Sequence, residues 1–189
     1  MKKLFICFGI LFGFILSFNL FSSEASAYTY PNGKASKPGD ILVTSDTTYK
    51  GIAGHVAIVV NSTQYLDLAS EGQTIKTRSL STWFKERDTT KVVRIKSATK
   101  AQQAANYAMT YNGVYIPYKI YGNLLDNTYM YCSKLIWQIY ALGTSNVIPI
   151  NESKTAIFTP YKFLDPYKYH IDASPSIVYK KGMTLIGLN

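Results

Sequence analysis

The sequence predicts an α+β protein in which helices pack on a mostly antiparallel sheet. Three observations support this class. Short β-branched and alternating apolar runs occupy the first half of the chain, two segments with helical periodicity follow, and one further alternating run lies near the C-terminus. Strands in succession followed by helices are typical of α+β proteins.

The predicted strands are short and are separated by turn signals. The first covers residues 41–44 after the turn motif KPGD, and a polar loop leads to a second at residues 55–60. The segment NSTQ then returns the chain to a strand at residues 65–69. Alternating apolar and basic residues predict half-exposed strands in TIKTRSL and KVVRIK, and the last strand lies within SIVYKKGMTLIGL.

Two segments carry helical signals. In TKAQQAANYAMTYNG, Thr99 is the expected N-cap and Gly113 the expected end. In YMYCSKLIWQIYALG, Gly143 is the expected end. This second helix places apolar residues at i, i+3, i+4, i+7 and i+8, which are Cys132, Leu135, Ile136, Ile139 and Tyr140.

Residues 1–27 have the features of a secretory signal peptide. Two lysines precede a long apolar run, and the segment ends in Ala25, Ser26 and Ala27. The apolar run alone could serve as a membrane anchor, but the small-residue ending after a polar break favours cleavage. Cleavage would leave 189 − 27 = 162 residues, the size of a single domain at residues 28–189. We therefore expect a secreted protein with no stable membrane span.

The chain is strongly basic. Its formal charge is +9, or +8 without Lys2, Lys3 and Glu24 of the expected signal peptide. On an exported protein this charge favours contact with anionic cell-wall polymers or phospholipid headgroups, and an extracellular, cell-wall-associated location, although solubility alone would explain it equally well. The lysines are scattered and no arginine-rich run with interleaved aromatics occurs, so nucleic-acid binding is not expected.

Cys132 and His55 are the candidate reactive residues. Cys7 lies in the expected signal peptide and has no lipobox before it, so the mature chain keeps one thiol, which cannot form an internal disulfide. Cys132 falls at or near a helix start, where a thiolate is favoured, and His55 begins a strand. Each alone would pass for a core residue, but together they suggest a papain-like cysteine hydrolase.

Several motifs carry a family resemblance. The strand segments are PGDILVT, GHVAIVV and YLDLA, and the thiol segment VYIPYKIYGNLLDNTYMYCSKLIW has a Pro-Tyr pair before Cys-Ser. These motifs are similar to those of the NlpC-type cell-wall cysteine peptidases. However, His55 precedes Cys132 by 132 − 55 = 77 residues, the reverse of that family's order. The chain therefore resembles the circularly permuted branch, the YiiX- and YycO-like hydrolases, and more remotely the lecithin:retinol acyltransferase-like proteins.

The resemblance covers about residues 38–166, which is most of the mature chain. The later segment IFTPYKFLDP also resembles the Pro-containing segment that follows the Cys helix in the YiiX and YycO branch. The resemblance implies a permuted papain-like fold, with an antiparallel sheet packed against helices and the nucleophile at a helix N-terminus.

A carboxylate that holds the His55 ring would complete the site. If paired residues of the hairpin sum to an even number, Asp67 lies on the same sheet face as His55, whereas a two-residue loop at Ser62 and Thr63 would put it on the opposite face. Glu71 has the same parity and could also reach the ring. The resemblance assigns the role to Asp67, in YLDL, and we favour it over Glu71.

Two tyrosines are candidate substrate contacts. Tyr118 matches the tyrosine of the family's Pro-Tyr pair, so the resemblance implies that it lines the cleft and contacts the substrate or the oxyanion. Tyr131, beside Cys132, is a second candidate. His170 lies in a loop rich in Tyr and Pro and is expected at the surface. No H-E-x-x-H, C-x-x-C or Gly-rich phosphate motif occurs, so neither a metal nor another cofactor is expected.

Three function classes are compatible with these residues. The favoured one is a secreted amidase or peptidase that cleaves an amide bond, in peptidoglycan peptides, through a triad of Cys132, His55 and Asp67. The acyltransferase-like relatives suggest a second, a lipid acyl hydrolase or acyltransferase. The third is a catalytically silent module that binds the cell wall.

Overall fold

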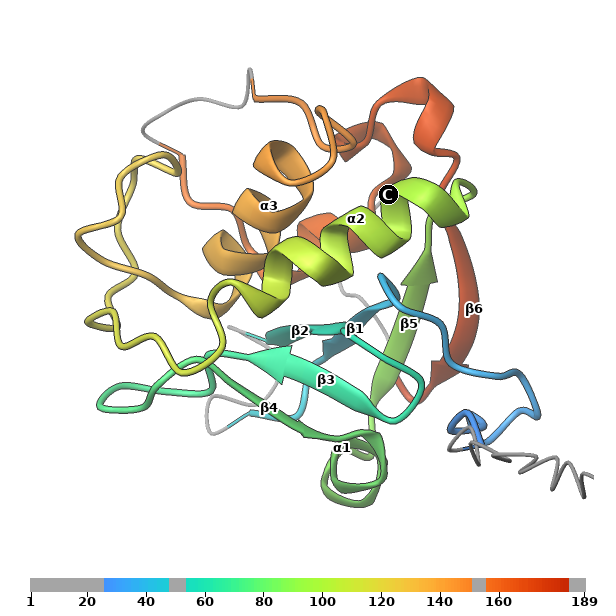
Figure 1. The fold of residues 1–189 in the computed structure, drawn as a ribbon. Helices are drawn as coiled ribbons and strands as arrows, with labels where there is room; N and C mark the ends of the chain where they lie inside the picture. Colours follow the sequence, from blue (N-terminus) through green and yellow to red (C-terminus); the bar gives the residue numbers. More distant parts are fainter. Residues whose placement is uncertain (1–25, 48–53, 151–155, 184–189) are drawn as a thin grey trace, which may run out of the picture.

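The computed structural model describes residues 26–47, 54–150 and 156–183, and within them a single antiparallel sheet carries helices on both faces (Figure 1). The sheet has the strand order β4-β3-β2-β1-β5-β6. The strands are β1 (Ile41–Thr44), β2 (His55–Val59), β3 (Gln64–Asp67), β4 (Lys76–Ser79), β5 (Thr90–Arg94) and β6 (Ser176–Lys181). The α+β class and the antiparallel sheet are thereby confirmed.

Three α-helices and three short 3-10 segments complete the described fold. The helices are α1 (Leu80–Glu86), α2 (Ala98–Met109) and α3 (Cys132–Leu142). The 3-10 segments are η1 (Pro160–Leu164), η2 (Pro166–Lys168) and η3 (Ile171–Ala173). None of the helices in the described part of the chain has the length and apolar character needed to cross a bilayer.

Both faces of the sheet are buried, because α2 and α3 cover one face and α1 covers the other (Figure 1). Side chains alternate along β2, so Val56 and Ile58 join the cluster under α2 and α3, whereas Ala57 and Val59 join the cluster around Trp83 of α1. Covering both faces explains why every residue of β1 and β2 is buried.

Some expected boundaries differ from the structure. The N-cap of α2 is Ser97, whose hydroxyl accepts a hydrogen bond from the Lys100 amide at 3.3 Å, and Thr99 already lies inside the helix. Helix α1 was not expected from the sequence; Ser79 caps it by accepting from the Ser81 amide at 3.1 Å. Residues 1–25 of the expected signal peptide and 184–188 of the expected last strand lie outside the described residues.

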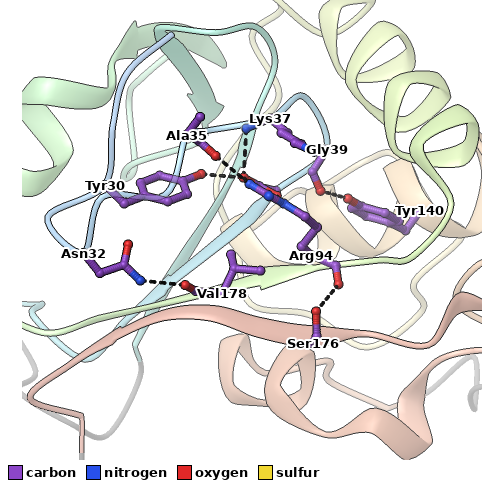
Figure 2. A network of polar contacts seen from close by, with 10 residues as sticks. Tyr30, Asn32, Ala35, Lys37, Gly39, Arg94, Tyr140, Ser176 and Val178 are labelled. Carbon is purple, nitrogen blue, oxygen red and sulfur yellow. Dashed lines mark hydrogen bonds and ion pairs between the residues drawn. The ribbon is translucent and has the colours of Figure 1, made fainter.

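A buried carboxylate, Asp40, lies immediately before β1 and organises the centre of the molecule. It accepts hydrogen bonds from the Tyr30 hydroxyl at 2.6 Å and from the Lys37 amide at 3.0 Å. Arg94 of β5 donates to it through Nε at 2.6 Å and through a terminal nitrogen at 2.7 Å. Figure 2 shows Tyr30, Lys37 and Arg94 converging on this point. The N-terminal segment is therefore fastened to the middle of the sheet.

The neighbouring residue, Gly39, connects the sheet to α3. The Gly39 amide donates to the Val59 carbonyl at 2.8 Å, and the Val59 amide donates to the Asp40 carbonyl at 2.8 Å. The hydroxyl of Tyr140, on α3, donates to the Gly39 carbonyl (Figure 2). One turn therefore fixes the end of β2 and the end of α3 relative to each other.

Gly39 is also the point where this turn approaches α2 most closely. Its φ is +82°, and an added Cβ would lie 2.5 Å from the Ala101 carbonyl oxygen. Gly33 has a similar φ of +84° but no atom within 4 Å of an added Cβ, so it is a matched control.

We predict that Gly39→Ala lowers the free energy of unfolding by about 2–5 kcal/mol and Gly33→Ala by about 1–2 kcal/mol, because both pay for the left-handed backbone but only the first also overpacks the turn. Urea unfolding of the two variants measures the difference. Equal losses would mean that the close approach of the turn to α2 is not tight in solution.

Candidate functional site

Cys132 is the first residue of α3. Tyr131 before it has extended dihedral angles (φ −142°, ψ 163°), and its carbonyl accepts the first helical bond, from the Leu135 amide at 3.0 Å. The amides of the first turn have no acceptor within the helix, and the positive end of the helix dipole lies at the thiol. The side chain is only 5% exposed and forms no disulfide. Its position favours a thiolate.

The register of the β2–β3 hairpin places Asp67 beside His55. The pairs Ile58 with Leu66 and Val59 with Tyr65 each sum to 124, an even number, so His55 and Asp67 lie on the same face. The Nε2 atom of His55 lies 2.9 Å from Oδ2 of Asp67, and both residues are buried. Glu71, the alternative partner, lies in an exposed turn. The structure therefore pairs His55 with Asp67.

Arg78 of β4 occupies the second oxygen of the same carboxylate. Its Nε donates to Oδ1 of Asp67 at 3.0 Å, and a terminal nitrogen donates to Oε1 of Gln73 at 3.0 Å. Burial alone would raise the pKa of the Asp67 carboxyl, but the hydrogen bond and charge of His55, followed by those of Arg78, hold that pKa below its ordinary value. Asp67 is therefore a carboxylate at neutral pH.

Trp83 of α1 supports the other side of the imidazole. The two rings stack with their centroids 5.8 Å apart and an angle of 27° between their planes. The indole nitrogen of Trp83 donates to Oγ1 of Thr90 at 3.1 Å, which fixes the ring. Neither Trp83 nor Arg78 was expected at the site. The helix-capping signal of Ser79, with apolar residues at Leu80 and Trp83, is the one sequence feature that points to α1.

The opposite charges of the Cys132 thiolate and the His55 imidazolium stabilise each other. Burial would lower the pKa of His55, but its hydrogen bonds and charge interactions with Asp67 and Cys132 raise that pKa to about 9. Burial would likewise raise the pKa of Cys132, but hydrogen bonds from His55, the Val56 amide and Tyr118, together with the charge of His55, lower it. Because Asp67 engages Nε2, the His55 nitrogen left for the sulfur is Nδ1. These interactions favour the thiolate and imidazolium forms of the pair.

The two candidate tyrosines have different environments. Tyr118 is half-buried and its hydroxyl hydrogen-bonds to Cys132; burial and then the negative charge of that thiolate raise its pKa, so it remains a hydrogen-bond donor. Tyr131 is buried, and its hydroxyl accepts a hydrogen bond from the Phe158 amide at 3.1 Å. The burial of Tyr131 favours a core role over the predicted contact with a substrate. His170 is exposed, 3.4 Å from Asp172.

Within the described residues no group of three or more His, Cys, Asp or Glu side chains is placed to hold a metal ion. The Asp67 carboxylate is already bound by His55 and by the guanidinium of Arg78, and a fixed positive charge there opposes a second cation.

Comparisons with known proteins agree with the YiiX-like part of the resemblance. A family model described as "Lipoprotein N-acylation protein LnsA-like" matches residues 1–174. The fold is similar to the crystal structure of metalloprotein yiiX from Escherichia coli O157:H7, with a TM-score of 0.56 and 17% identity over 77% of this chain and 97% of that one. At this identity the likeness shows the fold alone.

One curated relative is an uncharacterized 30.3 kDa protein of Bacillus thuringiensis. It is 32% identical over 146 residues, which are 69% of this chain and 53% of the relative. The chain thus spans about half the length of that protein.

We predict that alkylation of Cys132 by iodoacetamide has a pH midpoint below the ~8.5 of a free thiol. His55→Ala raises the midpoint because the imidazolium is lost, whereas His170→Ala leaves it unchanged. The rate is measured on the Cys132 peptide by mass spectrometry, with Cys132→Ala as the background. An ordinary midpoint in the parent, or the same midpoint in both histidine variants, contradicts the ion pair.

A second prediction concerns the carboxylate. Asp67→Asn keeps a hydrogen-bond partner for the ring but removes its charge, so the pKa of His55 falls from about 9 toward the ~6.5 of a free imidazole, and the alkylation midpoint of Cys132 rises. Glu71→Gln changes neither. Titration of the His55 ring by NMR follows the first effect. If Glu71→Gln has the larger effect in a folded protein, the hairpin register is wrong.

Proposed function

Since the chain belongs to the family of LnsA-like lipoprotein N-acylation proteins, we propose that it is a thiol-dependent lipid acyltransferase. Cys132 takes an acyl group from a lipid ester and passes it to an amine, and the N-terminal amine of a lipoprotein is the acceptor that the family description suggests. The observation that carries the proposal is the ion pair of Cys132 and His55 at the start of α3, oriented by Asp67.

The family match favours acyl transfer to or from lipids over the peptidoglycan amidase that the sequence alone made the first choice. The residues of the site suit both reactions, because a thiolate attacks an ester or an amide carbonyl in the same way. The export signal and the positive charge also do not distinguish a wall peptide from a phospholipid. We therefore take the lipid acyltransferase as the main function and keep the permuted papain-like site as its chemical basis.

In the first half-reaction the thiolate of Cys132 attacks the ester carbonyl and forms a carbon–sulfur bond. The amides in the first turn of α3 and the hydroxyl of Tyr118 are available to stabilise the negative oxygen of the tetrahedral intermediate. The imidazolium of His55 then gives its Nδ1 proton to the leaving alkoxide. The products are a thioester on Cys132, a neutral His55 and an alcohol.

In the second half-reaction an amine attacks the thioester. Neutral His55 accepts a proton from the attacking nitrogen, the carbon–nitrogen bond forms, and the carbon–sulfur bond breaks. The leaving thiolate again faces an imidazolium, so the initial state is restored. Asp67 and Trp83 keep the ring in place through both steps. Water in place of the amine would release a fatty acid, which is the hydrolase side of the same chemistry.

The proposed place of action follows from the substrate. Residues 1–27 would direct export. The basic mature chain would then work at the outer face of the membrane, where lipid esters and lipoprotein amines are both present. In this proposal the positive charge serves contact with phospholipid headgroups rather than with wall polymers.

The test is to trap the acyl-enzyme. We predict that the parent, incubated with phosphatidylglycerol vesicles, gains the mass of one acyl group on the Cys132 peptide, and that hydroxylamine removes it. Adding a diacylglyceryl-cysteine peptide with a free amine moves the acyl group to that amine. Cys132→Ala abolishes both products, and His55→Ala lowers turnover at least ~10²-fold, the lower range for general acid–base catalysis.

His170→Ala is the matched control and keeps parental turnover. A parent that releases fragments from labelled peptidoglycan but forms no acyl-enzyme from lipid would overturn the proposal in favour of the amidase.

A further inference from the structure

Residues 114–125, part of the connection between α2 and α3, expose several large apolar side chains. This segment contributes five of the twelve exposed large apolar residues in the described part of the chain, each 37–58% exposed. These five are Val114, Tyr115, Ile120, Tyr121 and Leu125. The segment contains one lysine, Lys119, and no carboxylate. Exposed apolar side chains gathered in this way usually mark a contact site.

Buried polar side chains of α3 hold the C-terminal part of this connection from the inside. Lys134 and Gln138 are fully buried, one helical turn apart. They donate hydrogen bonds to the backbone carbonyls of Leu124, Asp126 and Tyr129. A buried ammonium is costly unless such oxygens replace its water, so this position is strongly fixed. These carbonyl groups therefore face inward. Leu124 is buried with them, whereas five other apolar side chains of the segment stay exposed.

The N-terminal part is fixed to the sheet and borders the nucleophile. Val114 accepts a backbone hydrogen bond from Ile75 at 2.9 Å, and Met130 donates one to Pro117 at 3.0 Å. Tyr118, in the middle of the segment, pairs with Met130, two residues before Cys132, and its hydroxyl hydrogen-bonds to the Cys132 sulfur. The exposed apolar side chains thus lie on the same short stretch of chain as a residue that touches the nucleophile.

We infer that residues 114–125 are a docking surface for an anionic phospholipid bilayer. The inference deepens the proposed function and rests on it for the identity of the substrate. Tyrosines and aliphatic side chains suit the depth of the membrane interface, and the stem of Lys119 can bury there while its ammonium stays among the headgroups. The chain has 20 basic and 11 acidic side chains, which favours negative lipids.

Docking at this segment solves a problem of access. An acyl ester lies within a bilayer, whereas the Cys132 side chain is only 5% exposed. With residues 114–125 in the interface, a lipid would leave the bilayer beside Tyr118 and reach the thiol without passing through water. A water-soluble substrate would gain nothing from these exposed side chains.

The first experiment places a fluorescent reporter in the segment. Tyr121→Trp is mixed with vesicles of phosphatidylglycerol and phosphatidylcholine, and Tyr167→Trp is the control because Tyr167 is 92% exposed but lies outside the segment. The native Trp83 and Trp137 are buried and give a constant background. We expect a blue shift and quenching by brominated acyl chains for Tyr121→Trp alone, both weakened by salt. No shift, or equal shifts at both positions, overturns the inference.

The second experiment compares two substrates. In the double variant Ile120→Ser, Tyr121→Ser, the ratio of turnover on vesicle phospholipid to turnover on a soluble short-chain acyl ester should fall about tenfold or more, because membrane contact is lost. The control double variant Tyr167→Ser, Ile171→Ser removes two apolar side chains that are even more exposed but lie outside the segment, and it keeps the parental ratio. Circular dichroism checks that both fold.

The outcomes separate this inference from the proposed function. If Tyr121→Trp docks on vesicles but the parent turns over neither ester, docking stands and the acyltransferase fails. If both esters are turned over without docking, the acyltransferase stands and the docking surface fails. If the Ile120 and Tyr121 substitutions instead change the oligomeric state measured by light scattering, the surface is a protein interface and the membrane inference is overturned.

Discussion

The turn at Gly39 and Asp40 is the constraint on which the placement of the site depends. It binds the backbone of Val59 at the end of β2 and the hydroxyl of Tyr140 near the end of α3. His55 and Cys132 lie at the opposite ends of these two elements. The turn holds the end of β2 next to the end of α3. The first residues of the two elements, His55 and Cys132, therefore also lie close together. The buried Asp40 carboxylate keeps that turn in place.

The site itself is a line of alternating charges. Thiolate, imidazolium, carboxylate and guanidinium follow one another through Cys132, His55, Asp67 and Arg78, and their charges sum to zero. Such a sequence lets a charged ring lie in the protein interior, where a single charge would be expensive. Arg78 is the most exposed of the four side chains, so solvent stabilises the outer end.

Local patterns in the sequence were sufficient for β1, β2 and the start of α3, because strand and helix signals depend on neighbouring residues. Strand parity did not separate Asp67 from Glu71, and the preference for Asp67 came from the family resemblance. Contacts between distant segments were not predictable in this way. Tyr131 is next to Cys132 in the chain, yet its extended backbone turns the ring into the core toward Phe158. Trp83 stands on a helix too short to show a clear period. The substrate could not be predicted from the sequence either, since a thiolate and an imidazolium can cleave both esters and amides.

The anchoring of the connection between α2 and α3 has a consequence for engineering. Lys134 and Gln138 bind the backbone carbonyls of this connection, and carbonyls are present whatever side chains the residues carry. The outward residues can therefore be exchanged while the frame beneath them is kept. If these residues dock the protein as we infer, a grafted set of outward side chains would direct the same thiol to another surface.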